Sequence, residues 1–209
     1  FNVKESDPLP RKMVNNYALT KLMAEEMILG MNGKGIETIA LRPRAIIGAG
    51  DTVIFPRIVE ASASGKLRII GRGDNICHLT CARNVIEAIM CCINAGKQAY
   101  GQAYNISDGE PVKLWDALNY ALEALGMEPC IKKVPTWMAM TAARVAEIKA
   151  LARGGEREPA MTRYSVAVLG HSLTLDISRA REILNYKPVM TSREGINEFI
   201  EWHRGIRHD

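Results

Sequence analysis

The segment Asn15–Pro43, NNYALTKLMAEEMILGMNGKGIETIALRP, decides the fold because it contains one complete helix-to-strand unit. Apolar side chains recur at three- and four-residue steps in its first half, which predicts a helix over residues 15–30. These apolar positions are Leu19, Leu22, Met23, Met27 and Ile28. Asn15 or Asn16 would cap the start of this helix. The apolar, partly β-branched stretch Ile36–Leu41 then predicts a short buried strand.

The same alternation of helix and strand continues along the chain. Further helices are expected over residues 55–64, 84–95, 115–125, 137–152, 178–184 and 193–204, and strands over 67–70, 102–107, 131–134 and 173–175. The glycine-containing stretch 71–75 predicts a hairpin turn between two strands. Strands that alternate with helices place the chain in the α/β class.

Composition excludes several classes of protein. The 209 residues carry a net charge of +4, with 6% aromatic residues and no block of Lys or Arg. This mild charge and the scarcity of aromatic rings argue against nucleic acid as a partner. The longest uncharged run, Tyr164–Leu175, is shorter than the roughly 18 residues of a membrane-spanning helix, so no transmembrane segment is expected.

The five cysteines favour a reducing environment. An odd number that includes the adjacent pair Cys91–Cys92 does not suggest a disulfide framework. Small buried thiols in a reducing compartment fit this pattern, which predicts a cytoplasmic protein. Cys77, His78 and Cys81 match no zinc-ligand spacing, so no metal site is expected.

Tyr17 and Lys21 form the strongest candidate for chemistry. Residues four apart project from one face of a helix, so the phenol and the ammonium would lie close together. A phenol with a pKa of about 10 is a poor acid or base at neutral pH, but a nearby ammonium favours the phenolate and lowers that pKa. Such a pair can exchange a proton with a carbonyl or alcohol oxygen while hydride moves at the carbon.

Longer motifs surround this pair. They are Asn16–Lys21 followed by Ala24-Glu25, Leu41–Asp51 (LRPRAIIGAGD), Tyr104–Pro111 (YNISDGEP), Asp176–Ala180, Leu184–Pro188 (LNYKP) and Glu194–Trp202. Together, and in this order, they resemble the extended short-chain dehydrogenase/reductases of the NAD-dependent epimerase/dehydratase superfamily. The resemblance is strongest to the 3β-hydroxysteroid dehydrogenase-type branch, and it covers essentially the whole chain.

The resemblance implies a catalytic and a cofactor-binding role for particular residues. Tyr17 would be the catalytic acid/base, and Lys21 would bind the nicotinamide ribose and assist Tyr17. Both would contact the cofactor, which is expected to be NAD or NADP. The residues that would pass beside the nicotinamide ring are Pro43, Arg44, Ala45 and Ile46.

The resemblance also implies a substrate site. Phe55 and Ile58 would line its mouth, and Asn84 would begin a helix between the two lobes as a further substrate contact. The alternative role for Asn84 is a simple helix N-cap. The family usually has an acid just before this asparagine, whereas this chain has Arg83, which weakens substrate inferences drawn there.

The resemblance implies two lobes. Residues 1–58 would be the C-terminal part of a Rossmann-type dinucleotide-binding domain with a doubly wound sheet. Residues 59–209 would form a smaller α/β substrate-binding lobe, with 84–107 returning to the Rossmann sheet. No GxGxxG or GxxGxxG pattern occurs in the chain, so the glycine-rich cofactor turn and the catalytic Ser/Thr are expected upstream of Phe1. A homodimer is expected from the family alone.

Three functions follow as hypotheses. The first is an NAD(P)-dependent oxidoreductase that interconverts hydroxyl and keto groups on a hydrophobic substrate, either steroid-like or a long-chain β-hydroxy or β-keto acid. The second is a nucleotide-sugar epimerase or dehydratase, which the missing Arg-Asp-Phe/Tyr-Val motif disfavours. The third is a non-catalytic NAD(P)-sensing or scaffold protein, which the presence of both Tyr17 and Lys21 disfavours.

Overall fold

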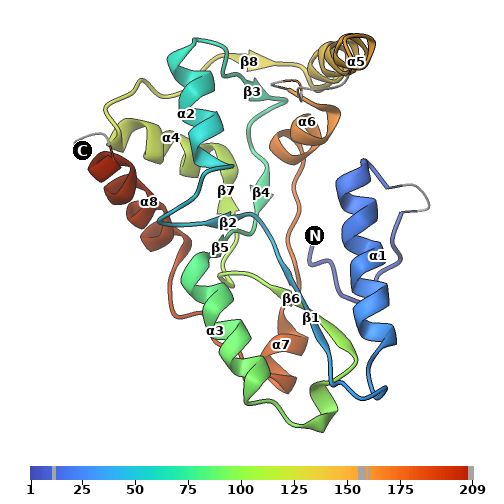
Figure 1. Cartoon of the computed structure of the whole chain (residues 1–209). Helices are drawn as coiled ribbons and strands as arrows, with labels where there is room; N and C mark the ends of the chain where they lie inside the picture. Colours follow the sequence, from blue (N-terminus) through green and yellow to red (C-terminus); the bar gives the residue numbers. More distant parts are fainter. Residues whose placement is uncertain (11–12, 155–158, 160, 207–209) are drawn as a thin grey trace.

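The computed structural model describes residues 1–10, 13–154, 159 and 161–206, in which paired strands are surrounded by helices (Figure 1). The longest pair is β1 (Ile39–Pro43) with β6 (Gln102–Ile106), which run parallel. The other pairs are β2 (Ile46–Ile47) with β5 (Thr80–Cys81) and β3 (Ile69–Ile70) with β8 (Lys133–Val134), both parallel, and β4 (Ile76–Cys77) with β7 (Val112–Lys113), antiparallel. Helices that connect parallel strands confirm the predicted α/β class.

Helices surround these strands, and several of them pack into two hydrophobic cores. The helices are α1 (Asn16–Gly30), α2 (Phe55–Ala63), α3 (Ala82–Ile93), α4 (Leu114–Ala124), α5 (Thr136–Ala152), α6 (Arg163–Gly170), α7 (Ser178–Ile183) and α8 (Ser192–Ile206), with a short 3-10 helix at Lys97–Ala99. Buried Phe55, Trp115 and Phe199 join α2, α4 and α8 in the main core, whereas Tyr104 and Tyr186 lie in a second core with α3 and α7. No helix among the described residues has the length and apolar character needed to cross a membrane.

Three local expectations differ from the structure. Residues 173–175 form isolated bridges to Cys77 and Val3 instead of a strand. Helix α6 lies within a run of uncharged residues and was not expected, yet Thr162 and Ser165 cap it reciprocally: Ser165 N donates to Thr162 Oγ1 at 3.1 Å and Thr162 N to Ser165 Oγ at 2.9 Å. The hairpin prediction for residues 71–75 was wrong, because β3 pairs with β8 and β4 with β7. The turn therefore joins strands of different sheets.

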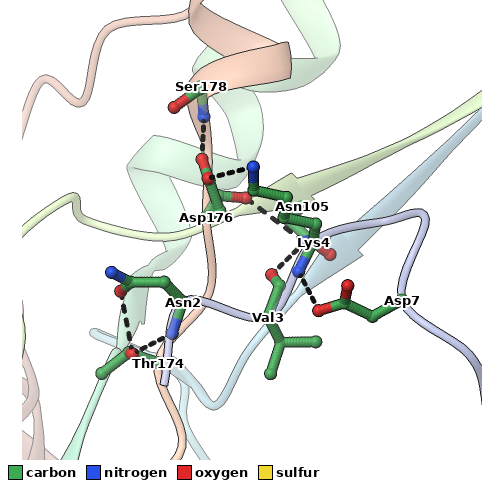
Figure 2. A network of polar contacts seen from close by, with 8 residues as sticks. All are labelled: Asn2, Val3, Lys4, Asp7, Asn105, Thr174, Asp176 and Ser178. Carbon is green, nitrogen blue, oxygen red and sulfur yellow. Dashed lines mark hydrogen bonds and ion pairs between the residues drawn. The ribbon is translucent and has the colours of Figure 1, made fainter.

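The first residues of the chain lie alongside residues 174–176, far away in the sequence (Figure 2). Val3 N donates to Thr174 O at 2.8 Å, and Asp176 N donates to Val3 O at 2.9 Å. Asn105 of β6 donates its Nδ2 to the same Val3 carbonyl at 2.9 Å. The segment that leads into α1 is thus anchored to the end of β6 and to the segment before α7.

Asn84 and Asp108 form a buried hydrogen-bond network at the base of α3. Asn84 Nδ2 donates to Asp108 Oδ1 and to Met190 O, both at 2.7 Å, and Asn84 Oδ1 accepts from Met190 N at 3.0 Å. Asp108 also accepts from Cys81 N at 2.6 Å and from Ser192 Oγ at 2.7 Å. Burial, followed by the Asp108 charge, raises the pKa of the Cys81 thiol, which therefore stays protonated. This network connects β5, the end of β6, α3 and α8.

The first turn of α8 approaches β5 so closely that it requires glycine. A Cβ at Gly195 would overlap the Cys81 sulfur and would lie 3.3 Å from Ile47 Cδ1. Both neighbours are buried, so neither side chain can move aside without disturbing the core. Glycine is therefore required at position 195 because there is no room for a side chain, and not because of its backbone dihedral angles.

We predict that Gly195→Ala lowers the free energy of unfolding by about 1–3 kcal/mol through overpacking. Gly205→Ala in the same helix is the matched control, because nothing lies within 4 Å of a Cβ there. The control should leave stability unchanged or raise it by up to about 1 kcal/mol. Urea unfolding of the two full-length variants measures the difference, and equal midpoints would contradict the close approach of α8.

Asn84→Asp should destabilise the protein by about 2–4 kcal/mol at pH 7, because it replaces a donor to Asp108 with a second buried carboxylate. Repulsion would raise the pKa of the new carboxyl in the folded state above its unfolded value of about 3.9. The loss of stability should therefore be smallest near pH 4 and should grow as the pH rises.

Asn94→Asp, at the exposed end of α3, is the control for this variant. Its stability should differ little from that of the unchanged protein between pH 4 and pH 8. Denaturant unfolding at several pH values compares the two variants. A pH-independent loss in Asn84→Asp would show that charge repulsion is not its cause.

Candidate functional site

Tyr17 and Lys21 lie together at the start of α1, as the four-residue spacing predicts. Asn15 caps the helix by accepting a hydrogen bond from Ala18 N at 2.9 Å, which confirms one of the two expected caps. Lys21 Nζ lies 5.9 Å from the centre of the Tyr17 ring. Tyr17 is 63% exposed. Among the described residues, Lys21 makes no ion pair with a carboxylate.

A bidentate ion pair between Arg42 and Glu25 holds α1 against β1. Arg42 donates its Nε to Glu25 Oε2 at 2.8 Å and its Nη2 to Glu25 Oε1 at 2.6 Å. The hydrogen bond to Glu25 raises the pKa of Arg42. Helix α1 runs antiparallel to β1 (Figure 1). Tyr17, at the start of α1, therefore lies on the same side of this ion pair as the carboxyl end of β1. Ligands of open α/β sheets bind at that end of the strands.

The stretch Pro43–Ile46 leaves the carboxyl end of β1 in a strained conformation. Ala45 has φ +47°, a left-handed conformation that costs a residue with a Cβ about 1–2 kcal/mol. Buried Thr80 holds it there: its Oγ1 donates to Arg44 O at 2.6 Å, and its backbone N donates to Ala45 O at 3.2 Å. The Thr80 hydroxyl also accepts from Arg44 N at 3.1 Å. Hydrogen bonds from Thr80 thus fix the backbone that is predicted to pass beside the cofactor.

Arg44 itself has an unusual environment. Its Nε is buried and has no hydrogen-bond partner, and its guanidinium forms no ion pair within the part of the chain that the structure describes. Burial lowers the pKa of Arg44, and the Cys77 and Tyr164 side chains oppose that shift. Arg42, only two residues earlier, has a carboxylate partner, whereas Arg44 has none among the residues that the structure describes.

The three residues predicted to contact substrate lie in the protein interior. The Phe55 ring is 2% exposed and stacks on Phe199 with ring centres 4.7 Å apart. Ile58 is 8% exposed in the same core. Asn84 is fully buried, and hydrogen bonds within the fold occupy both its amide nitrogen and its amide oxygen. In the structure Phe55 and Ile58 pack in the core, and Asn84 makes hydrogen bonds within the fold.

Two residues that matter for this region had no predicted role. Thr80 received no role from the sequence alone, yet Thr80 holds the backbone of Arg44 and Ala45 by hydrogen bonds. Asp108 was noted only as part of a motif, yet it accepts hydrogen bonds from three other parts of the chain. One feature of the sequence could have identified both residues, namely a polar residue at the end of a buried strand, because such a residue must find hydrogen-bond partners.

The sequence matches known proteins along its whole length. A "3-beta hydroxysteroid dehydrogenase/isomerase family" profile matches residues 1–134. The chain is 37% identical to "3beta-hydroxysteroid-dehydrogenase/decarboxylase isoform 1" of Arabidopsis thaliana, with 96% of this chain and 48% of that protein aligned. It is 32% identical to a "2-alkyl-3-oxoalkanoate reductase" of Shewanella oneidensis, with 93% of this chain and 53% of that protein aligned.

Solved structures agree on the fold. A dTDP-glucose 4,6-dehydratase from Streptomyces venezuelae, with NAD and DAU bound, superposes with a TM-score of 0.70 at 18% identity. The alignment covers 100% of this chain and 56% of the dehydratase. This chain spans about half the length of the curated relatives described above. Because the family profile covers well over half of its residues, the chain belongs to the 3-beta hydroxysteroid dehydrogenase/isomerase family.

Proposed function

We propose that the protein containing this chain is an NAD(P)-dependent oxidoreductase. It would interconvert a hydroxyl and a keto group on a hydrophobic substrate, either steroid-like or a long-chain β-hydroxy or β-keto acid. The observation that carries this proposal is the open Tyr17–Lys21 pair at the start of α1, toward the carboxyl end of β1. The family membership and the reductase and dehydrogenase names of the relatives support it.

Tyr17 would move the proton in this reaction. In the reductive direction its hydroxyl would donate a proton to the carbonyl oxygen, and in the oxidative direction its phenolate would accept the alcohol proton. The Lys21 ammonium lies 5.9 Å from the centre of the Tyr17 ring, on the same face of α1. The residues thereby supply acid–base catalysis on one oxygen atom of the substrate.

The residues present fit a nicotinamide cofactor. When bound, NAD or NADP would supply or accept the hydride. Lys21 has no carboxylate partner among the described residues, which leaves its ammonium available for a ribose hydroxyl. The clamped backbone from Pro43 to Ile46 would lie beside the nicotinamide ring. A fixed backbone at this position would orient the ring at little entropic cost.

Nucleotide-sugar epimerisation or dehydration is the second candidate, and the likeness to the dTDP-glucose dehydratase is the observation that favours it. That likeness, at 18% identity, concerns the fold alone. Assays of the full-length protein with sterols, β-hydroxy acids and UDP-sugars, each with NAD and NADP, separate the two. Turnover of UDP-sugars alone would favour the second candidate, and NAD binding without any turnover would favour a sensing or scaffold role.

Tyr17→Phe in the full-length enzyme should reduce kcat by about 100-fold or more, because it removes the proton donor. The Kd for NAD(P) should change little, since the ring and Lys21 remain. Tyr100→Phe is the control. Tyr100 lies just before the amino end of β6, away from the carboxyl ends of the strands, and its hydroxyl donates a hydrogen bond to Ala95 O. Stopped-flow measurement of NAD(P)H absorbance and fluorescence titration provide both numbers. A Tyr17→Phe enzyme with normal kcat would refute the assigned role.

A further inference from the structure

A single side chain of β5 holds the backbone that directly follows β1. Thr80 is fully buried, and its Oγ1 accepts a hydrogen bond from Arg44 N at 3.1 Å. The same oxygen lies 2.6 Å from Arg44 O and 3.2 Å from Ile106 O, and its proton can be donated to either carbonyl. Thr80 N also donates to Ala45 O at 3.2 Å. Thr80 therefore contacts three backbone atoms of Arg44 and Ala45.

Thr80 is itself fixed on both sides along β5. Leu79 O accepts a hydrogen bond from Asp108 N at 2.9 Å, and Cys81 N donates to Asp108 Oδ1 at 2.6 Å. Asp108 is buried and lies two residues after the end of β6. Because both neighbours of Thr80 are bonded to one buried residue, the hydroxyl cannot move away from Arg44 without breaking these hydrogen bonds.

The segment that Thr80 holds would not keep its conformation unaided. Ala45 has φ +47°, and residues other than glycine, asparagine and aspartate rarely adopt this left-handed conformation. Strained backbone of this kind persists only where the surrounding structure imposes it, and it is concentrated at ligand-binding sites. Removal of the Thr80 hydroxyl would therefore allow Ala45 to relax out of the left-handed conformation.

This strained segment lies at the end of the strands where ligands bind. Pro43 pairs with Ile106 at the carboxyl ends of the parallel strands β1 and β6, and Arg44 and Ala45 follow directly. Ligands of open α/β sheets bind outside those ends. The chain has no glycine-rich GxGxxG or GxxGxxG pattern for a diphosphate. A change in this segment should therefore affect the nicotinamide half of the cofactor and not its ADP-ribose half.

We infer that Thr80 is a positioning residue for the cofactor, whose hydroxyl keeps Ala45 left-handed and thereby sets the affinity for the nicotinamide half. This inference rests on the proposed function, because it presumes a nicotinamide ring beside Pro43–Ile46. Thr80 is buried beneath the backbone that it holds, so it acts through that backbone and does not touch the cofactor. A hydroxyl group on β5 would thus control a contact made by residues that follow β1.

The test compares NADH with ADP-ribose, which lacks the nicotinamide, as ligands of the full-length enzyme. NADPH and 2′-phospho-ADP-ribose replace them if the enzyme prefers NADP. Thr80→Val keeps the shape of the side chain without its hydroxyl. It should raise the Kd for NADH by about 10-fold and change the Kd for ADP-ribose by less than about 2-fold. Thr80→Ser, which keeps the hydroxyl, should bind NADH within about 3-fold of the unchanged enzyme. Fluorescence titration and calorimetry provide these constants.

Thr38→Val is the matched control. Thr38 is buried just before the amino end of β1, and its hydroxyl has no hydrogen-bond partner among the described residues. This variant should leave both dissociation constants unchanged. Urea unfolding checks that each variant is folded, and Thr80→Cys, whose thiol is only a weak donor, replaces Thr80→Val if the latter does not fold.

Ala45→Gly tests the route through the backbone, because glycine adopts the left-handed conformation without strain. In the Ala45→Gly background, Thr80→Val should raise the Kd for NADH by less than about 3-fold, since less strain remains to be held. An undiminished loss in that background would exclude the route through Ala45 and overturn the inference.

The other outcomes are equally distinct. An equal loss of NADH and ADP-ribose binding in Thr80→Val would assign Thr80 a general structural role. An unchanged Kd for NADH would show that the hydroxyl does not act on the site. A loss in Thr80→Ser as large as that in Thr80→Val would assign the effect to the methyl group. Each of these three results overturns the inference, whereas an unchanged enzyme that binds neither NADH nor NADPH would refute the proposed function itself.

Discussion

The parallel pairing of β1 with β6 is the constraint on which the rest of the structure depends. It places Pro43 opposite Ile106, so the residues that follow both strands emerge at one edge. Buried Thr80 joins that edge to β5, because its hydroxyl lies within hydrogen-bond distance of both Arg44 O, at 2.6 Å, and Ile106 O, at 3.2 Å. Buried backbone carbonyls at the ends of strands need hydrogen-bond partners. Thr80 is such a partner at the ends of both β1 and β6.

Helix α1, which presents Tyr17 and Lys21 near this edge, is held differently. Helix α1 contains no buried residue, so packing contributes little to its position. The ion pair between Glu25 and Arg42 and the anchored segment before the helix hold it instead. Buried polar groups thus fix the backbone after β1, whereas Tyr17 lies on an exposed helix beside it.

The sequence predicted most of the long elements, because their apolar periodicity and caps are local signals. It also predicted the Tyr17–Lys21 pairing, which depends only on helix geometry. It did not predict strands of two residues such as β2 and β5, since two residues carry no periodicity. The burial of Phe55 and Asn84 depended on tertiary contacts with Phe199 and Met190, more than 100 residues away, which no local pattern encodes.

The pairing of Val3 with residues 174–176 has a consequence for how the protein is made. Contacts that join segments about 170 residues apart slow folding, because a large loop must close before they form. At a synthesis rate of about 5–20 residues per second, residue 175 leaves the ribosome many seconds after residue 3. The segment leading to Tyr17 must therefore wait until residues 174–176 have been synthesised before it can be anchored.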